Sequence, residues 1–458
     1  MGNKTNRKKN SGIELFILRL MKVFDPVLVA ALFGITWFEF YAQTMYLEPF
    51  YRRGNYALIL LYLVIYAYLA HIYDGFNVST SKKNEIILSQ TLSLLLTNAL
   101  AYLIIFMLAR HIPNPIPLLI MFAAQIIISI LWTLVVSKWY FSAFQRKKTT
   151  IIFDERLGLD VLIEKYGLTA EFEIIKTIHC KDVLGSFKTL DDSEVVFFSG
   201  VHSHERNAIL KYCITNNITC YIIPRIGDVL MHGARKIHML RVPMLMVQRY
   251  NPNIEYALLK RLMDIVISLI CIIVFSPIML IISIAIKAHD GGPVIYSQTR
   301  ATKDGKLFKM LKFRSMIVNA ESDGVARLST GETDNRITPV GKIIRRYRLD
   351  ELPQVFNVLV GHMSIIGPRP ERPEIIQEYV KTIPEYSLRL QSKAGMTGYA
   401  QLYGKYNSTP YDKLQLDLFY TINPSLIEDF RIIIATIKIL FIKDSTDGIE
   451  DGQTNALK

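Results

Sequence analysis

The stretch LMDIVISLICIIVFSPIMLIISIAI, residues Leu262–Ile286, decides how the second half of the chain is placed, because it is long enough to cross a membrane as a helix. Lys260 and Arg261 precede it, and a run of basic residues beginning at Lys287 follows. Positive charge at both ends indicates that both ends face the cytoplasm. The central Ser276-Pro277 pair provides a break, since proline removes an amide donor and the serine hydroxyl can satisfy freed backbone groups. We predict a re-entrant helix that enters and leaves on one face, with a kinked ordinary span as the alternative.

Four further apolar stretches come earlier in the chain, and each approaches or exceeds the roughly 17–25 residues that a spanning helix needs. They are Val27–Gln43, Tyr56–Tyr73, Ile86–Ala109 and Ile116–Val136. Basic residues gather before the first stretch, between the second and third, and after the fourth, which predicts that both ends of the bundle are cytoplasmic. We interpret residues 1–148 as a basic tail and a four-helix transmembrane bundle, and the whole chain as an α+β membrane protein.

The composition supports a membrane protein and argues against nucleic acid as a partner. Hydrophobic residues make up 51% of the 458 residues, and the net charge is +13. The basic residues lie mainly beside apolar segments, a distribution that fits contact with anionic lipid headgroups and phosphorylated substrates. The almost purely apolar spans argue against a transporter. The four cysteines have no paired spacing and are expected to be reduced, structural thiols.

Residues 149–251 have a different pattern, in which short strands alternate with helices. Strands are expected at Ile151–Phe153, Glu194–Phe198 and Cys220–Pro224, and helices at Leu157–Tyr166 and Ser203–Asn216. This alternation predicts a small soluble α/β module with a Rossmann-like arrangement. A dinucleotide is not expected, because a single glycine follows the first strand. The pair His202-x-His204 lacks a second Cys/His pair at ligand spacing and is interpreted as a solvated loop.

Farther along, the motif Arg348-Leu349-Asp350-Glu351-Leu352-Pro353-Gln354 sets two adjacent carboxylates among cations. Carboxylates held that way stay ionised and can act on phosphate oxygens, directly or through a hard divalent ion. Pro353 starts a short predicted helix, Gln354–Leu359, which places both carboxylates near its partly positive amino-terminal end. The alternative is an exposed Asp-Glu pair at a helix start, with arginines in ordinary surface pairs.

A second phosphate-binding feature is Arg369, which lies between two prolines in Gly367-Pro368-Arg369-Pro370. The prolines would fix its backbone and present the guanidinium in one direction, as bidentate phosphate recognition favours. Lys312, Arg314 and Arg336 add further cations at close spacing. A charged phosphate-handling site beside a broken membrane segment indicates chemistry on a lipid-borne phosphate.

From about Leu259 to Leu440 the chain resembles the bacterial sugar transferases, the monotopic polyprenyl-phosphate hexose-1-phosphate transferases that start capsule, exopolysaccharide and O-antigen repeat units. The motifs that carry the resemblance are Lys260-Arg261-x-x-Asp264, Ser276-Pro277, Asp290-Gly291-Gly292-Pro293, Lys312-Phe313-Arg314-Ser315-Met316, Asp350-Glu351-Leu352-Pro353-Gln354 and Pro368-Arg369-Pro370. The four spans and the α/β module resemble the large members of that family. The resemblance implies that residues 252–458 form a membrane-associated catalytic domain with the re-entrant helix.

The resemblance also implies a two-step exchange. Asp350 would attack the β-phosphate of a UDP-hexose, release UMP and hold the sugar phosphate, which undecaprenyl phosphate then takes. Asp350 and Glu351 would hold Mg²⁺, although Glu351 could instead orient the nucleophile. The implied substrate-binding residues are Lys312, Arg314, Arg336, Arg348, Pro368, Arg369 and Pro370. The residues implied at the lipid headgroup and at the helix break are Lys260, Arg261, Asp264, Ser276 and Pro277, with plain interfacial anchoring as the alternative for the first two.

The implied partners are a UDP-hexose, undecaprenyl phosphate, the lipid bilayer and a second copy of the chain in a homodimer. Glucose and galactose are the favoured hexoses, and N-acetylated sugars are further candidates. The implied location is the bacterial inner membrane, with the catalytic domain on the cytoplasmic face. The chain departs from the family pattern at His362, where an acidic residue is usual, and at Pro424, where many members carry tryptophan. The tail Phe430–Ile442 is expected to lie on the membrane surface, and a catalytically silent membrane scaffold is the alternative function.

Overall fold

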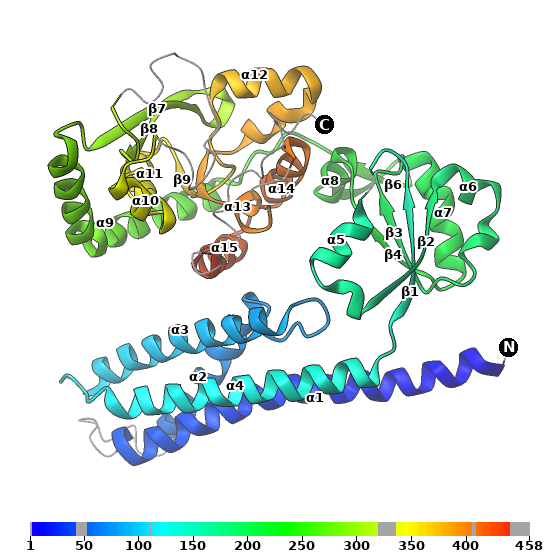
Figure 1. Cartoon of the computed structure of the whole chain (residues 1–458), viewed down its shortest axis with the longest axis horizontal. Helices are drawn as coiled ribbons and strands as arrows, with labels where there is room; N and C mark the ends of the chain where they lie inside the picture. Colours follow the sequence, from blue (N-terminus) through cyan, green and yellow to red (C-terminus); the bar gives the residue numbers. More distant parts are fainter. Residues whose placement is uncertain are drawn as a thin grey trace. The chain divides into compact units, whose positions relative to one another are not determined.

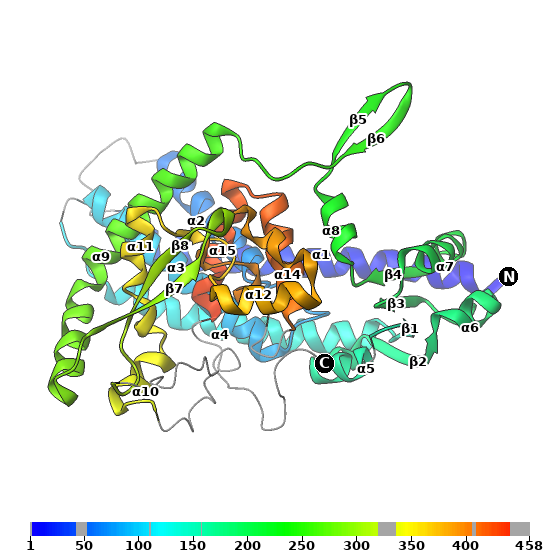
Figure 2. The ribbon, with the colours of Figure 1, turned by 90° about the horizontal axis from the view of Figure 1, so that it is seen from above.

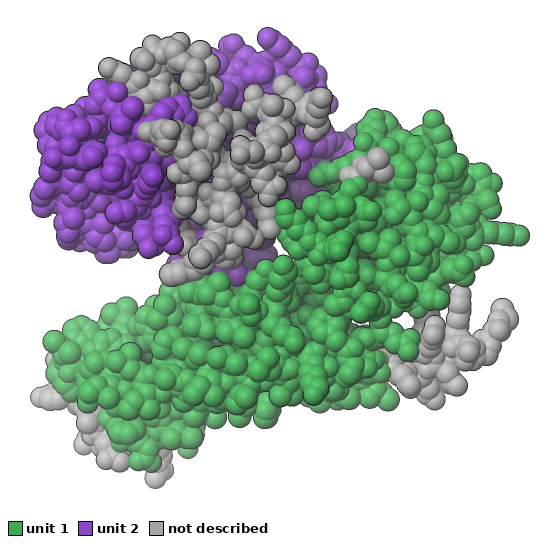
Figure 3. Space-filling model, in the orientation of Figure 1, with its two compact units in different colours: residues 1–223 green, residues 224–458 purple. Residues whose placement is uncertain are grey.

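The computed structural model describes residues 2–42, 53–109, 111–156, 158–318, 336–404 and 409–439, with side chains from residue 12 onward. The chain divides into two compact units, Met1–Ile223 and Pro224–Lys458 (Figure 3). The boundary predicted from the sequence lies after residue 251. The short helix α8 (Ile226–His232) belongs to the second unit, because its Val229 is buried in one cluster with Leu418.

Four helices form a bundle in the first unit: α1 (Gly2–Thr36), α2 (Arg53–Ile72), α3 (Lys83–Ala109) and α4 (Ile116–Ala143) (Figure 1). A short π-helical turn, η1 (Trp37–Tyr41), continues α1, and the apolar faces meet in one core around Phe33 and Leu94. Four helices of the described chain are long and apolar enough to cross a membrane, namely α2, α3, α4 and α9 (Ile254–Asp290). The first predicted span, Val27–Gln43, falls on the end of α1 and on η1, and Gln43 lies outside the described residues.

Polar side chains lie buried inside this bundle, which the interpretation of the spans as almost purely apolar did not anticipate. Gln125 is fully buried, and its Nε2 donates to the Tyr62 hydroxyl at 2.9 Å and to the Val29 carbonyl at 3.2 Å. Its Oε1 accepts a hydrogen bond from Asn98 Nδ2 at 2.9 Å. Such internal pairing satisfies polar groups that lipid would leave without partners.

A parallel sheet with strand order β2-β1-β3-β4 follows the bundle in the first unit. The strands are β1 (Lys147–Phe153), β2 (Phe172–His179), β3 (Val195–Ser199) and β4 (Thr219–Ile222). The helices and 3-10 turns between them are α5 (Leu159–Lys165), η4 (Leu168–Ala170), α6 (Cys180–Gly185), η5 (Phe187–Leu190) and α7 (Ser203–Thr215). Ile152, Phe198 and Ile209 lie in its buried core. The three predicted strands are confirmed, whereas β2 was missed.

The second unit begins with α8 and a hairpin of β5 (Arg235–Met239) and β6 (Val242–Met246), which extends away from α8 in Figure 2. After α9 come an antiparallel pair, β7 (Ile295–Ala301) and β8 (Leu307–Phe313), and a short parallel pair, β9 (Ser364–Ile366) and β10 (Gly395–Thr397). The helices are α10 (Pro339–Arg346), α11 (Gln354–Val360), α12 (Pro373–Thr382), α13 (Tyr399–Leu402), α14 (Pro410–Ile422) and α15 (Leu426–Ile439), and the 3-10 turns are η6 (Lys303–Gly305), η8 (Leu349–Glu351) and η9 (Pro384–Gln391). Helix α11 confirms the helix predicted after Pro353. The predicted tail helix corresponds to α15, and residues 440–442 lie outside the described chain.

Helix α9 is continuous but turns part-way along its length (Figure 1). A straight helix would separate Arg261 from Ile286 by about 37 Å. Arg261 nevertheless donates to the carbonyls of Val358 and Leu359 in α11, each at 2.7 Å, while Ile286 lies in a cluster against which Leu352 packs just before α11. Both parts of α9 therefore lie against the same region of the second unit.

The pair Ser276-Pro277 occupies the middle of α9. Because Pro277 has no amide hydrogen, the Ile273 carbonyl loses its usual helical partner, and Ser276 Oγ donates to that carbonyl at 2.9 Å. This is the backbone compensation that the sequence predicted. The apolar side chains around the break are exposed in the second unit, as shown by Ile273 at 72% and Ile281 at 65%.

Candidate functional site

The carboxylates of Asp350 and Glu351 are presented on a tight turn whose entry is strained. Arg348 has a φ of +54°, in the left-handed region that costs a non-glycine residue about 1–2 kcal/mol. The 3-10 turn η8 follows directly and leads through Pro353 into α11. Backbone strain of this kind concentrates at functional sites, where the surrounding structure holds it in place.

Glu351 is held by two cations from different elements. Lys312 Nζ, from β8, lies 3.0 Å from Glu351 Oε1, and Arg369 Nη2, from the loop after β9, lies 2.9 Å from the same oxygen. Burial opposes ionisation of Glu351, but the charges of Lys312, Arg369 and Arg348 outweigh it and hold the pKa of this carboxyl well below its usual range. The charge of Glu351 in turn raises the pKa of the Arg369 guanidinium. Glu351 is therefore ionised, as the sequence predicted.

Asp350 has a different environment, although it is the preceding residue. Within the described chain its carboxylate has no hydrogen-bond or ion-pair partner. Burial raises the pKa of Asp350, Lys312 opposes that shift, and the neighbouring Glu351 charge adds to it. The surrounding cations therefore favour the ionised form of both carboxyls, as predicted, but at Asp350 burial outweighs them and the net pKa shift is upward. Asp350 keeps carboxylate oxygens available beside cations, as a nucleophile that attacks phosphate requires.

The donor chemistry of this pair fits the predicted magnesium ion. Glu351 Oε1 is already shared by Lys312 and Arg369, so ligand oxygens would come from Asp350 and from Glu351 Oε2. Mg²⁺ takes hard oxygen ligands, commonly one or two carboxylates with phosphate oxygens and water completing its shell. These two residues can supply such a partial shell.

The loop that carries Arg369 is supported by buried charges that the sequence analysis did not single out. Arg389 Nη2 donates to the Arg369 carbonyl at 2.9 Å and lies 2.7 Å from Asp417 Oδ2. The Arg389 and Asp417 side chains are only 3% and 1% exposed. A signal was present in the sequence, because Asp417 is an isolated charge within the apolar run of α14 and such charges are seldom buried without a partner.

Two of the arginines predicted to bind substrate, Arg314 and Arg336, have contacts other than the ion pairs that hold Glu351. Arg314 follows β8, is buried, and forms a bidentate pair with Asp290 at the end of α9, in which Nη1 and Oδ2 are 2.8 Å apart. This pair fastens α9 to β8. The Arg336 carbonyl accepts a hydrogen bond from the Ile317 amide at 2.9 Å, and residues 319–335 between them lie outside the described chain. Substrate binding by Arg314 and Arg336 stays a prediction.

The residues predicted at the lipid headgroup have partners inside the second unit. Lys260 Nζ lies 3.1 Å from the buried Asp429 carboxylate, and Arg261 binds the last carbonyls of α11. Asp264 is buried and accepts a hydrogen bond from Ser364 Oγ at 3.0 Å. These contacts give all three residues a role in joining α9 to the unit, and their contact with a lipid headgroup stays a prediction.

Comparison with known proteins identifies the second unit. The profile of the family described as "Bacterial sugar transferase" matches residues 255–443. A UDP-glucose:undecaprenyl-phosphate glucose-1-phosphate transferase of Caulobacter vibrioides is 36% identical over 199 residues, which are 42% of this chain and 74% of that protein. An exopolysaccharide production protein of Rhizobium leguminosarum bv. phaseoli is 40% identical over 188 residues, which are 39% of this chain and 93% of that protein. The chain belongs to the bacterial sugar transferase family.

A third relative in this comparison is a UDP-N-acetylgalactosamine-undecaprenyl-phosphate N-acetylgalactosaminephosphotransferase of Aeromonas hydrophila. It is 39% identical over 239 residues, which are 52% of this chain and 55% of that protein. The chain therefore spans about half the length of this relative. The residues that match the sugar transferase family profile begin within α9, so the bundle and the parallel sheet of the first unit lie outside the matched residues.

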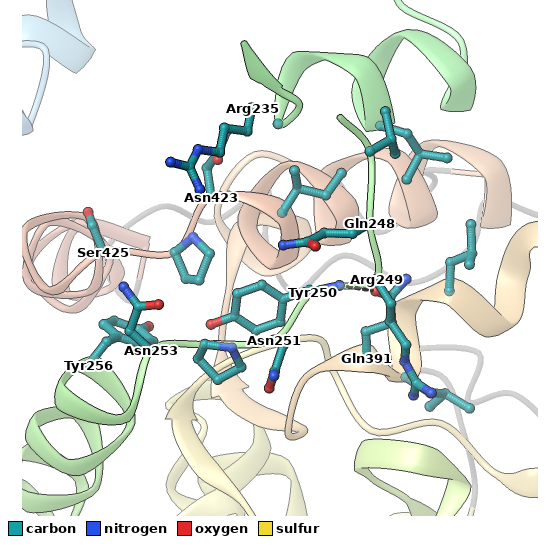
Figure 4. A pocket seen from close by; sticks show the side chains of 18 of the residues that line it. Arg235, Gln248, Arg249, Tyr250, Asn251, Asn253, Tyr256, Gln391, Asn423 and Ser425 are labelled. Carbon is teal, nitrogen blue, oxygen red and sulfur yellow. Dashed lines mark hydrogen bonds between the residues drawn. The ribbon is translucent and has the colours of Figure 1, made fainter. Parts of the chain in front are cut away.

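A separate cavity of about 1440 Å³ lies in the second unit of this family member (Figure 4). It is lined by residues of the α8–α9 connection, the start of α9, η9 and the α14–α15 turn, among them Arg235, Tyr250 and Asn423. The Tyr250 amide donates to Gln391 Oε1 at 3.0 Å on its wall. Neither carboxylate of η8 lines this cavity, so it is distinct from the site described above.

Proposed function

We propose that this chain transfers hexose-1-phosphate from a UDP-hexose to undecaprenyl phosphate and releases UMP. Membership of the family supports the proposal, and so do the relatives, whose names specify glucose and N-acetylgalactosamine. The observation that carries it is the Asp350 carboxylate, which no described residue pairs with, beside a Glu351 held by two cations. UDP-glucose and UDP-galactose are the favoured donors. The reaction would be the first membrane step in making a capsule, exopolysaccharide or O-antigen.

In the first proposed step an Asp350 carboxylate oxygen attacks the β-phosphorus of the UDP-hexose. The bond between that phosphorus and the bridging oxygen breaks, and UMP leaves with the electron pair. In the second step a phosphate oxygen of undecaprenyl phosphate attacks the phosphorus of the aspartyl-bound sugar phosphate, which gives undecaprenyl-diphospho-hexose and regenerates the carboxylate. Lys312 and Arg369, both fixed on Glu351, place positive charge beside the transferred phosphate.

Asp350 and Glu351 are the proposed protein ligands of Mg²⁺. When bound, this ion neutralises negative charge on the diphosphate. Because two cations share Glu351 Oε1, the principal task of Glu351 in this scheme is to hold Lys312 and Arg369 in place, with its second oxygen left for the ion.

For the membrane, we propose that α9 enters and leaves the bilayer on the cytoplasmic face of the inner membrane. The contacts of both parts of α9 with one region of the second unit support this geometry, as do the exposed apolar side chains around Pro277 and the basic residues at both ends. The carboxylates would then lie where cytosolic UDP-sugars and the lipid phosphate meet. The predicted homodimer stays a prediction.

An activity assay on the purified full chain tests the transfer. A panel of UDP-sugars is offered with undecaprenyl phosphate and Mg²⁺, and UMP formation is measured. We expect release with at least one UDP-hexose and a loss of at least about 10³-fold in Asp350→Asn. Glu374→Gln, an exposed acidic residue on α12, is the matched control and should keep the activity. Full activity in Asp350→Asn would refute the nucleophile, and no UMP from any UDP-sugar would favour the silent scaffold.

Thiol labelling tests the geometry of α9 separately from the chemistry. In a variant without the four native cysteines, Lys306→Cys on the exposed surface after η6 should react with a membrane-impermeant maleimide only once spheroplasts are opened. Arg53→Cys, at the start of α2 in a predicted outer loop, should react in intact spheroplasts. Labelling of Lys306→Cys in intact spheroplasts would mean that α9 is an ordinary span.

A further inference from the structure

Away from the proposed catalytic site, three metal-binding side chains meet at the carboxyl edge of the parallel sheet in the first unit. Asp154 directly follows β1, while His202 and Glu205 lie at the start of α7, which follows β3. In the strand order β2-β1-β3-β4, β2 lies on one side of β1 and β3 lies on the other. The chain therefore continues from β1 to a strand on one side and afterwards to a strand on the opposite side. The crevice outside the ends of β1 and β3 is the switch point at which open α/β sheets bind ligands.

The three side chains are already close enough to share one ion. Their donor atoms all lie within 4.8 Å of one another. His202 Nδ1 donates a hydrogen bond to Asp154 Oδ2 at 2.8 Å. A metal ion at Nδ1 would move the ring proton to Nε2, which faces Glu155 Oε1 at 3.5 Å. Glu205 Oε2 is buried and has no hydrogen-bond partner among the residues that the structure describes. A buried carboxylate oxygen without a partner is unfavourable, and a bound cation would satisfy it.

His179, at the end of β2, also approaches Asp154 but has a different role. Its Nδ1 accepts a hydrogen bond from the Lys181 amide at 3.2 Å, so the proton of the neutral ring lies on Nε2. Nε2 faces Asp154 Oδ1 at 3.5 Å. Because the Lys181 amide occupies the Nδ1 lone pair, the ring proton cannot move off Nε2, so His179 positions the Asp154 carboxylate and is not itself a ligand.

We infer that Asp154, His202 and Glu205 form a site for a divalent transition-metal ion, with Zn²⁺ as the best fit. Three protein ligands with a water molecule in the fourth position are the ligand set of an open tetrahedral zinc site. The imidazole favours Zn²⁺ over Mg²⁺ and Ca²⁺, which prefer shells made of oxygen alone. The bound ion would tie the end of β1 to the start of α7 and leave one coordination position open.

The site also explains why the pair His202-x-His204 gave no metal prediction. His204 is exposed and is not among the donor atoms that meet at this site, so the pair contributes one ligand only. Asp154 follows β1, whereas His202 comes just before α7, 48 positions later in the chain. A search for closely spaced Cys and His residues does not find a site assembled across two strand ends.

Zinc titration of the purified full chain tests this inference. After removal of bound metals with a chelator, Zn²⁺ binding is measured by equilibrium dialysis in excess Mg²⁺, which occupies other carboxylate sites. We expect one tightly bound Zn²⁺ per chain and at least about 100-fold weaker binding in His202→Ala and Glu205→Gln. His204→Ala, from the same turn of α7, is the matched control and should change the affinity by less than about threefold.

A spectroscopic readout keeps the test independent of small changes in stability. Co²⁺ in place of Zn²⁺ should give the visible absorption of a four-coordinate ion, and Glu205→Gln should abolish it while the near-ultraviolet circular dichroism stays unchanged. His202→Gln replaces His202→Ala if the alanine variant does not fold. The inference fails if folded Glu205→Gln binds Zn²⁺ as the unmodified chain does, or if His204→Ala loses as much affinity as His202→Ala. It also fails if the unmodified chain binds Zn²⁺ no more tightly than Mg²⁺.

Discussion

Replacing Arg389 by methionine should destabilise the second unit more than any loss of surface charge can. Arg389 lies 2.7 Å from Asp417, and both side chains are almost fully buried. The same guanidinium donates to the Tyr386 hydroxyl at 2.7 Å and to the Arg369 carbonyl at 2.9 Å. Arg389→Met therefore leaves the Asp417 carboxylate buried without its cation and leaves the Arg369 carbonyl without its donor.

The magnitude follows from the burial. Removal of one partner of a buried ion pair typically costs about 3–5 kcal/mol, because the remaining charge has lost its compensation. For a unit of this size that free energy lowers the melting temperature by roughly 6–20 °C. Replacing both partners, as in Arg389→Met/Asp417→Leu, removes the isolated charge as well and should recover most of the loss, since apolar pairs of similar volume often match a buried ion pair.

The loss of stability caused by Arg389→Met should also grow as the pH rises. Burial raises the pKa of Asp417 to about 6, although Arg389 opposes the shift. The folded state thus binds the proton more tightly than the unfolded chain, and this group's contribution to stability is lost as pH rises toward the folded pKa. Without Arg389 the folded pKa rises further, so Arg389→Met should keep losing stability above pH 6, where the unmodified chain no longer does.

Thermal unfolding of the detergent-solubilised protein at pH 5.5 and pH 8 measures both effects. Arg346→Met, a change of the same type at an exposed position on α10, is the control and should shift the melting temperature by little. A melting temperature of Arg389→Met within about 2 °C of the unmodified chain would refute the reasoning. So would a double variant as unstable as the single one, because the cost would then not arise from the isolated Asp417 charge.

Three further substitutions each test one local interaction. Arg345→Gln removes a charge that lowers the pKa of Asp350, so the acid limb of UMP release should move to higher pH. Gly367→Ala would place a Cβ 2.2 Å from a backbone carbonyl oxygen and should cost about 1–3 kcal/mol of stability in the loop that leads to Arg369. Gln125→Leu removes the hydrogen bonds inside the bundle, and at about 0.6 kcal/mol each it should lower the free energy of unfolding by about 1–2 kcal/mol. The pH profile of UMP release tests the first change, and thermal unfolding in detergent tests the other two.

Each of these predictions has an outcome that contradicts it. The exposed neighbour Arg346→Gln should leave the acid limb where it is, and an equal shift in both variants would point to net charge and not to Asp350. An unchanged melting temperature in Gly367→Ala would mean that the Lys393 carbonyl moves aside at little cost. If Gln125→Leu is as stable as the unmodified chain, apolar packing replaces the internal hydrogen bonds.

Features whose causes lie within a few residues were predictable from the sequence. Proline at position 353 fixes the backbone for a first helical turn, and α11 begins directly after it. Ser276 lies within reach of the carbonyl that Pro277 frees, and the two are hydrogen-bonded. The clusters of valine, isoleucine and phenylalanine in β1 and β3 indicated buried strands. The strand β2 was missed because Glu173, Lys176 and other polar residues interrupt its apolar pattern.

Pairings between distant residues were not predictable in this way. Arg314 is paired with Asp290, 24 positions away, and Asp264 with Ser364, 100 positions away. A run of basic residues shows that cations gather near a site, but it does not show which anion each one faces. The boundary after Ile223 was not predictable for the same reason. It depends on the attachment of α8 to α14, which is made by apolar contacts between residues far apart in the chain.

The 3-10 turn η8 explains how two adjacent carboxylates come to have opposite properties. With about three residues per turn, neighbouring side chains on such a turn point roughly 120° apart. Glu351 can therefore face Lys312 and Arg369 while Asp350 faces elsewhere, and the pKa of Glu351 falls while that of Asp350 rises. Whether Glu351 binds metal or orients Asp350 was open from the sequence. Since one Glu351 oxygen carries both ion pairs, Glu351 in the proposed scheme first fixes the two cations, and Mg²⁺ would bind its other oxygen together with the Asp350 carboxylate.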